Sequence, residues 1–374
     1  MLNLSIMEKE ELQSAVINLL RFPLIVGVIF IHNYKSTMVV QGVEIGCNSM
    51  NMPIYYLCSE FFSKVIGSIS VPLFFFISGY LFFLKIDFGL DIYLNKLKKR
   101  MHTLLIPYLF WNITFLLAYF LVSYIPEVSV WFKEFDFSLS YIFSGLWAQN
   151  TVIAPNPHPI APQFWFIRDL MVVVVLSPLI FYYLKYFKKW GVIILALLWL
   201  WDLKIPYWGE RGFSTVVFLF FSAGAWYSIN KKNILECCFS SNLVCFFIWG
   251  GYPLLAIWDL CTKNELYNIY IHKIGIVMGI LFMFLLASYL IEKRKVHINK
   301  FLASASFFIF AIHDPWLLTQ IRKVMFRIFK PETDIILTMF YFLMVFLTVV
   351  IALLIYYLLR QLLPRFTAVI TGGR

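Results

Sequence analysis

Apolar stretches long enough to cross a lipid bilayer recur along the whole chain, and they constrain its fold more than any other feature. Their approximate ranges are 15–34, 64–84, 103–125, 165–184, 190–203, 214–229, 242–260, 274–291, 301–320 and 335–359. Backbone polar groups in lipid must bond within their own segment, so each stretch is expected to be a helix. The sequence therefore predicts an all-α, polytopic integral membrane protein with about ten transmembrane helices. The short run at 190–203 and the proline in 301–320 leave nine or eleven spans open.

Composition excludes a water-soluble globule, because mean hydropathy is +0.80 and only 14% of residues are charged. The net charge of +11 comes from short basic clusters between apolar runs, which is typical of cytoplasmic loops rather than of nucleic-acid binding. We therefore expect both termini in the cytoplasm and no nucleic-acid partner. A basic group at residues 322–330 would then lie outside. Either this segment is an amphipathic helix at the outer surface, or the last two predicted spans are misplaced.

The chain is expected to comprise a cytoplasmic segment at 1–14, a single transmembrane domain at 15–360 and a cytoplasmic tail at 361–374. Two external segments are long, and the second holds a proline-rich stretch at 154–163 that is either a lid or acceptor-binding loop or a plain connector. The six cysteines have no CxxC spacing, so no metal site is predicted. A disulfide between Cys47 and Cys58 in the first external segment stays an open alternative.

Two ionisable residues, Arg21 and His32, lie in the first apolar run. They are eleven residues apart, which on a helix is close to three turns, so both project from one face about 16 Å apart. Ionisable groups facing lipid are costly, so this face is expected to look into the protein or a water-filled cavity. The alternative is that Arg21 snorkels to the headgroups and His32 only ends the helix.

The predicted topology sorts the other polar residues of the spans into two layers. The inner layer holds Arg21 and Arg100, and the outer layer holds His32, Arg168, Asp169 and His313. Arginines at the inner mouth can bind the phosphates of a cytoplasmic donor. A neutral imidazole further along can take the proton from an acceptor hydroxyl that attacks a thioester. This layering suits a transfer reaction across a bilayer.

Five stretches resemble the motifs of one family, in the family's order and over almost the whole chain. They are Arg21 with His32 eleven residues later, VPLFFFISGYLFF at 71–83, KKRMHTLLIPYLFW at 98–111, QFWFIRDLMVVVVLSPLI at 163–180 and SFFIFAIH at 306–313. The chain thus resembles the membrane acyltransferase-3 family, whose members O-acylate bacterial surface glycans. One position departs from the resemblance, because His102 stands where relatives usually carry a second arginine after Arg100.

The resemblance implies an acyl-CoA donor, most often acetyl-CoA, and an essential His32 acting as the catalytic group. It also implies a glycan or lipid-linked sugar acceptor reached from the far side of a bacterial cytoplasmic (inner) membrane. Arg21 and Arg100 would bind the donor phosphates, and the acceptor side would be lined by Ser78, Arg168, Asp169 and His313. No permanently bound cofactor is expected. Direct attack by the acceptor and a transient acyl-histidine are both open.

Each assignment has a structural alternative. Topology alone could place Arg100 in its basic loop, and Ser78 could serve helix packing. Arg168 and Asp169 could simply neutralise each other, and His313 could be a hydrogen-bonded interior histidine. At the level of function, the competing class is a transporter or flippase of lipid-linked sugars, in which the same polar groups line a translocation path. A glycan polymerase is a third class, although the external loops are modest in size.

Overall fold

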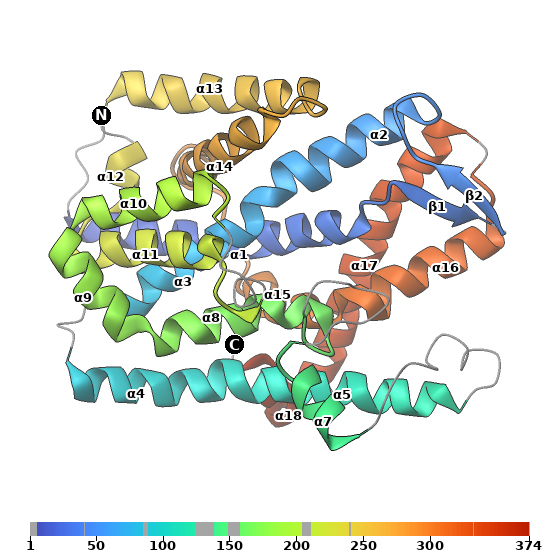
Figure 1. The fold of residues 1–374 in the computed structure, drawn as a ribbon, viewed down its shortest axis with the longest axis horizontal. Helices are drawn as coiled ribbons and strands as arrows, with labels where there is room; N and C mark the ends of the chain where they lie inside the picture. The colour runs from blue at the N-terminus through green and yellow to red at the C-terminus, as the bar shows by residue number, and fades with distance from the viewer. Residues whose placement is uncertain are drawn as a thin grey trace. The chain divides into compact units, whose positions relative to one another are not determined.

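The computed structural model describes most of the chain (Figure 1). The described residues are 6–40, 42–84, 89–124, 138–148, 158–203, 211–238, 241–331 and 333–373. They divide into two compact units, the first formed by Met1–Ile77 with Tyr227–Leu358 and the second by Ser78–Trp226 with Leu359–Arg374. Both units are built from helices, which confirms the predicted all-α class.

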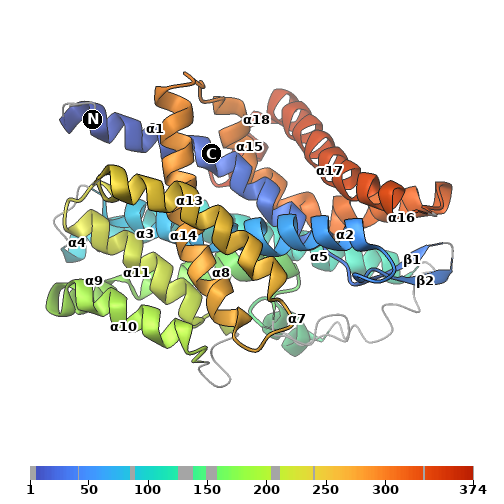
Figure 2. The same ribbon diagram turned by 90° about the horizontal axis from the view of Figure 1, so that it is seen from above.

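The first unit contains the N-terminal helix and most of the C-terminal half. Its elements are α1 (Ile6–Asn33), β1 (Thr37–Val40), β2 (Val43–Gly46), α2 (Pro53–Ser59), the start of α3 (Ser70–Phe83), α12 (Ile234–Cys238), α13 (Asn242–Cys261), α14 (Asn268–Glu292), α15 (Lys300–Ile312), α16 (Leu318–Ile328) and most of α17 (Asp334–Leu362). Helix α1 packs against α14 and α15. Helices α13 and α14 lie side by side in both ribbon views (Figures 1 and 2).

Helix α1 is continuous even though it contains Pro23. Its buried face repeats every four residues, at Val16, Leu20, Leu24 and Val28, so one stripe of the helix is covered by the unit. The backbone of Gly67, in the segment that joins α2 to α3, comes so close to α1 that an added Cβ would lie 3.2 Å from the Gly27 carbonyl oxygen. This close approach packs the segment around Gly67 directly against α1.

The segment after α1 holds the described strands of the chain, which the sequence analysis did not predict. Strands β1 and β2 pair antiparallel, and Gly42 in the turn between them has a φ of +83°, which glycine adopts without strain. Helix α2 follows, and its first N–H groups, those of Ile54 and Tyr55, donate to the carboxylate of Asp334 at the start of α17, at 2.6 and 2.8 Å. A carboxylate there also suits the positive end of the α2 dipole.

The second unit holds the middle of the chain and its C-terminus. Its elements are the end of α3, α4 (Leu90–Arg100), α5 (Ile106–Ser123), α7 (Leu139–Gly145), α8 (Trp165–Val175), α9 (Ser177–Phe187), α10 (Lys189–Leu200), most of α11 (Thr215–Ile229) and α18 (Pro364–Thr371). Helix α18 packs on α5, where the Trp111 indole donates to the Ile370 carbonyl oxygen at 3.1 Å.

Glycine is required at position 79 of α3, because the Phe221 carbonyl of α11 occupies the place of a side chain there.

Seven helical segments of the described chain are long and apolar enough to cross a membrane, or eight if the bent pair α8 and α9 forms a single span. The predicted span at 165–184 is this pair, which bends by 63° at Leu176, just before Pro178 in the first turn of α9. The predicted spans at 190–203 and 214–229 fall on the shorter helices α10 and α11. A 12-residue helix covers only about 18 Å, so the count of ten is not confirmed.

The basic segment at 322–330 begins within helix α16, which is amphipathic, while its place at the outer surface stays a prediction. Helix α16 buries Leu318, Met325 and Phe326, while Lys323 and Arg327 are exposed. The structure thus has an amphipathic helix in the segment whose basic residues disagreed with the positive-inside rule.

Cys47 and Cys58 are free thiols, so the structure does not pair them in a disulfide. The proline-rich stretch at 154–163 lies partly outside the described residues.

Candidate active site

The end of α1 brings His32 against an acidic residue from the other half of the sequence. The Nδ1 atom of His32 lies 3.4 Å from Oδ2 of Asp314, and about a quarter of each side chain remains exposed. The His32 ring also packs edge-on against the ring of His313, with 4.9 Å between centroids. The structure therefore joins two predicted site residues, His32 and His313, and adds a carboxylate that the sequence analysis had not assigned to the site.

A break in the helical backbone places Asp314 there. Helix α15 ends at Ile312, and Asp314 itself has an extended backbone, with φ −142° and ψ 141°, before α16 begins. Pro315 follows, and its lack of an N–H suits an interrupted helix. The hydroxyl of Thr319 donates to Oδ1 of Asp314 at 2.7 Å, so one carboxylate oxygen is held by α16 and the other faces His32.

His313 is fully buried. Its Nδ1 lies 2.7 Å from the carbonyl oxygen of Phe310, and this oxygen can accept a hydrogen bond only if Nδ1 carries the proton. The Nε2 atom then holds a lone pair, and this atom is buried without a hydrogen-bond partner among the described residues. At Nδ1, His313 is a hydrogen-bonded interior histidine, as the structural alternative expects. At Nε2 it has no hydrogen-bond partner among the described residues.

Asn33 and Arg322 anchor the end of α1 behind His32. The Asn33 amide donates to the Tyr341 carbonyl oxygen of α17 at 2.9 Å and accepts from the Arg322 guanidinium of α16 at 3.0 Å. Ser63 bonds both to the Phe30 carbonyl oxygen, at 2.5 Å, and to the Tyr341 hydroxyl, at 2.6 Å. Helices α16 and α17, together with Ser63 in the segment after α2, therefore hold the end of α1 that carries His32.

Arg21 lies on the same unbroken helix as His32, and both side chains are half-buried. The continuity of α1 through Pro23 preserves the helical spacing on which the prediction of a shared face depends. Arg21 thus belongs to the first unit, together with His32 and His313.

The second unit holds the remaining predicted residues. Arg100 ends α4 and is half-buried, with its guanidinium carbon 6.0 Å from the centre of the Phe82 ring. Lys96, one turn earlier, lies over the same ring at 5.0 Å. Two cations therefore contact one aromatic ring. Ser78 is half-buried in α3, beside the close helix contact at Gly79.

Arg168 and Asp169 form a buried ion pair within the second unit. The Nε and Nη2 atoms of Arg168 each lie 2.9 Å from Oδ1 of Asp169, and the two side chains are 2% exposed. Arg168 also donates to the Trp147 carbonyl oxygen at 3.1 Å, and the Ser214 hydroxyl lies 3.4 Å from Asp169. The pair thus neutralises itself and ties two chain segments to α8, as the structural alternative expects.

Comparison with known proteins identifies the family to which this chain belongs. The sequence model of an acyltransferase domain, that of acyltransferase-3 proteins, matches residues 15–357. The chain belongs to the acyltransferase-3 family. The match runs from α1 to α17, so it includes Arg21, His32, the Arg168–Asp169 pair and His313. The protein is therefore an acyltransferase, and its apolar helices make it a multi-pass integral membrane protein.

A curated relative is the succinoglycan biosynthesis protein ExoH of Rhizobium meliloti (strain 1021). It is 26% identical to this chain over 372 residues, which cover 96% of the chain and 92% of the relative. No solved structure matches the chain significantly.

The sequence analysis missed Asp314, Asn33 and Arg322. Asp314 carried a signal, because a carboxylate within an apolar run is a functional-site candidate by itself. Its partner His32 lies 282 positions earlier, and no local pattern predicts such a contact. Arg322 was seen only as a charge on the wrong side of the membrane, although its guanidinium bonds the residue after His32.

Proposed function

We propose that this acyltransferase moves an acyl group, chiefly acetyl, from acyl-CoA to a hydroxyl group of a cell-surface or lipid-linked glycan at the bacterial cytoplasmic membrane. The family supports the acyl transfer. The glycan acceptor is supported by the relative, whose name assigns it to succinoglycan biosynthesis. The family also favours the enzyme over the transporter and the polymerase.

The observation that carries the mechanism is the His32–Asp314 pair. A carboxylate beside Nδ1 favours the tautomer with its proton on that atom, which leaves the Nε2 lone pair free to act as a base. In the proposed step, Nε2 takes the proton of the acceptor hydroxyl while the oxygen attacks the thioester carbonyl. The new C–O bond forms, the C–S bond breaks, and the proton passes from His32 to the leaving thiolate of CoA.

Donor binding is assigned to Arg21 and Arg100. About 16 Å of helix separates Arg21 from His32, which is comparable with an extended pantetheine arm. A guanidinium stays charged when it loses water and binds phosphate oxygens with two parallel bonds, so Arg21 suits the phosphate end of CoA. Arg100 is proposed for the same role, with Lys96 beside it as a second cation over Phe82.

Four residues are proposed for the acceptor side: Ser78, Arg168, Asp169 and His313. The contact of the His313 ring with His32 supports its place in the lining of the site. The Arg168–Asp169 pair has its charges balanced internally, so we propose that it acts by holding α8 and the 145–148 segment in place. Ser78 stays a prediction.

The test is binding and turnover of radiolabelled acetyl-CoA by the purified protein in nanodiscs. We expect His32→Ala to bind acetyl-CoA and lose turnover, and Arg21→Ala to lose binding. His272→Ala is a matched control, because His272 also pairs through Nδ1 with an aspartate, Asp259, at 2.7 Å. Arg294→Ala removes an exposed charge of the same kind. Normal turnover by His32→Ala, or no interaction of folded wild type with acetyl-CoA, would refute the proposal.

A further inference from the structure

A strongly basic pocket lies beside the candidate active site, within the first unit. It has a volume of about 520 Å³, within the usual range of small-molecule sites. It is lined by Lys35, Thr37, Met38, Val39, Arg322, Lys323, Phe326 and Arg327. Among these described residues four are cationic and none is acidic. Arg322 bonds Asn33, but no ion pair among the described residues accounts for the side-chain charges of the other three cations.

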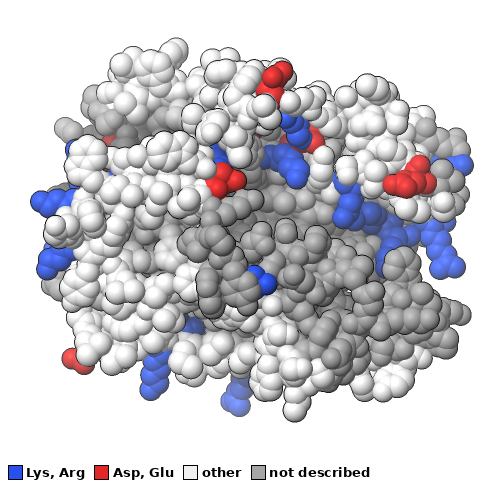
Figure 3. All heavy atoms as spheres, viewed as in Figure 1, with Lys and Arg blue, Asp and Glu red and all other residues white. Residues whose placement is uncertain are grey.

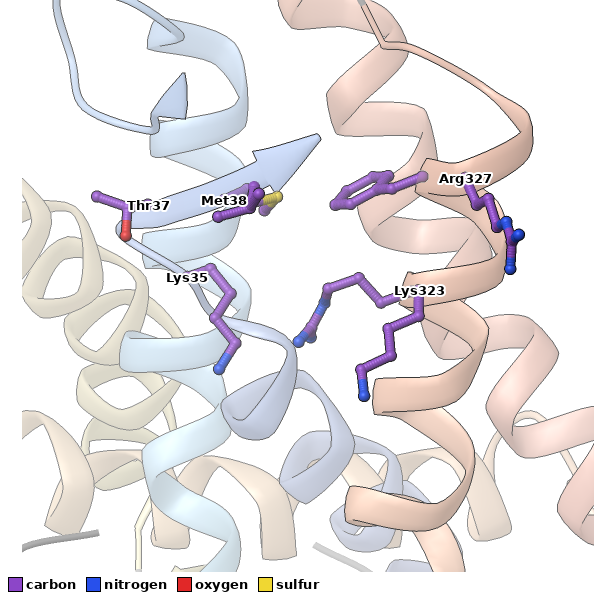
Figure 4. Close-up of a pocket in the computed structure, with 8 residues that line it drawn as sticks. Lys35, Thr37, Met38, Lys323 and Arg327 are labelled. Atoms are coloured by element: carbon purple, nitrogen blue, oxygen red, sulfur yellow. The ribbon is translucent and has the colours of Figure 1, made fainter. Parts of the chain in front are cut away.

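The pocket forms between α16 on one side and, on the other, β1 together with Lys35, two positions before it. In Figure 4, Lys35 and Lys323 reach into the gap from its two sides, and Arg327 lies at the far rim on α16. Figure 3 shows basic side chains gathered over the part of the first unit where Figure 1 draws β1, β2 and α16. The acid of this hairpin, Glu44, lies opposite Val39 in the sheet and does not line the pocket.

An unpaired donor lies in the wall of the pocket. The Nε atom of Arg322 is buried and has no hydrogen-bond partner among the described residues. A buried N–H without a partner is unfavourable, and a bound anion would satisfy it. Lys35 and Arg322 also lie near enough to one another for their charges to repel, which an anion between them would relieve. Met38 and Phe326 add apolar side chains to the lining, which can pack against the C–H face of a sugar ring.

The pocket is connected to the catalytic pair through two residues. Lys35 follows His32 by three positions, and Arg322 bonds Asn33, the residue next to His32. The carboxylate of Asp314 lies close enough to Lys35 and Arg322 to interact with their charges. A ligand held in the pocket would therefore contact two residues that are linked directly to the end of α1, which carries the imidazole that the proposed function makes the base.

We propose that this pocket binds the acidic part of the acceptor, a carboxylate- or phosphate-bearing saccharide, and so presents a neighbouring hydroxyl to His32. The inference rests on the proposed function for the identity of the ligand as an acceptor. Lys35, Lys323 and Arg322 hold the acid group, and Arg327 widens the positive field at the rim. The enzyme would thus select acidic glycans over neutral ones by charge.

The test compares two matched probes, cellotetraose and the same tetrasaccharide oxidised to the carboxylate at C6 of each unit. Binding is measured without acyl-CoA, on protein in nanodiscs of phosphatidylcholine. We expect wild type to prefer the oxidised tetrasaccharide. Lys323→Gln should weaken its binding about fivefold, and Lys35→Gln with Lys323→Gln about 25-fold, because each exposed charge contact contributes a factor of about five. Lys330→Gln is the matched control, since Lys330 is exposed close to α16 but does not line the pocket.

Three outcomes would overturn the inference. They are equal binding of the two tetrasaccharides to wild type, an equal loss in Lys330→Gln, and loss of binding when phosphatidylglycerol is added to the nanodiscs. The last would assign the pocket to lipid headgroups. The failure of the proposed function is read separately, because His32→Ala is expected to keep the preference for the oxidised probe. A protein that binds this probe but transfers no acyl group contradicts the function and not the pocket.

Discussion

Replacing Asp314 by asparagine tests whether the contact with His32 serves catalysis. The amide has the shape of the carboxylate and keeps the bond from Thr319, but it loses the charge that faces Nδ1 at 3.4 Å. A hydrogen bond to a charged group contributes about 1.5–3 kcal/mol, and a neutral one about 0.5–1.5 kcal/mol. The difference of about 1–2 kcal/mol corresponds to a fall in kcat of about 5- to 30-fold.

The assay is transfer of a radiolabelled acetyl group from acetyl-CoA by protein in nanodiscs. We expect kcat to fall while KM for acetyl-CoA stays unchanged, because Asp314 acts on the base and not on the donor. An amide that turned its N–H toward His32 would impose the other tautomer and enlarge the loss. The control is Asp259→Asn, which weakens the His272 pair of the same unit. Wild-type kcat in Asp314→Asn, or an equal loss in the control, would refute the reasoning.

Three further predictions concern stability and pH. Asp169→Asn leaves the buried Arg168 without its counter-charge and should lower the free energy of unfolding by about 3 kcal/mol, measured by thermal melting. Gly67→Ala should cost about 1–3 kcal/mol and reduce activity, because its methyl would lie 3.0 Å from a backbone oxygen, whereas Gly275→Ala meets nothing within 4 Å. Lost solvation and nearby Arg322 lower the pKa of Lys35. Lys35 should therefore lose its charge as the pH rises toward the usual lysine range, and affinity for the acidic tetrasaccharide should fall with it. Lys35→Arg should remove this pH dependence, because arginine keeps its charge.

Much of the fold follows from local sequence pattern. Each of the ten apolar runs corresponds to a helix or helix pair, because burial in lipid forces backbone bonds to close within a segment. The bend between α8 and α9 was signalled by Pro178, but its angle of 63° depends on what the two helices pack against. The hairpin at 37–46 was missed because two four-residue strands give too short an alternation to recognise in a loop.

The candidate site was predictable only where its residues share a helix. Arg21 and His32 could be placed together by counting turns, and the resemblance to the family supplied their roles. The contacts of His32 with Asp314 and His313 cross most of the chain, so they need the tertiary packing of α1 against α15. Arg322 was misleading in the sequence, because its charge could be read only as a topology signal, whereas in the structure its guanidinium bonds Asn33 and the residue lines a pocket.

The bond between Asn33 and the Tyr341 carbonyl has a consequence for biosynthesis. It joins the first apolar helix to the last one, and Asp334 adds a second link from α17 to α2. During synthesis, α1 enters the membrane before α15, α16 and α17 have been made. His32 is therefore without its contacts to Asp314 and His313 during this interval. Such distant pairing makes assembly slow and leaves polar groups uncovered in the meantime. Chains truncated before α17 should therefore insert in the membrane yet remain substrates for quality-control proteolysis.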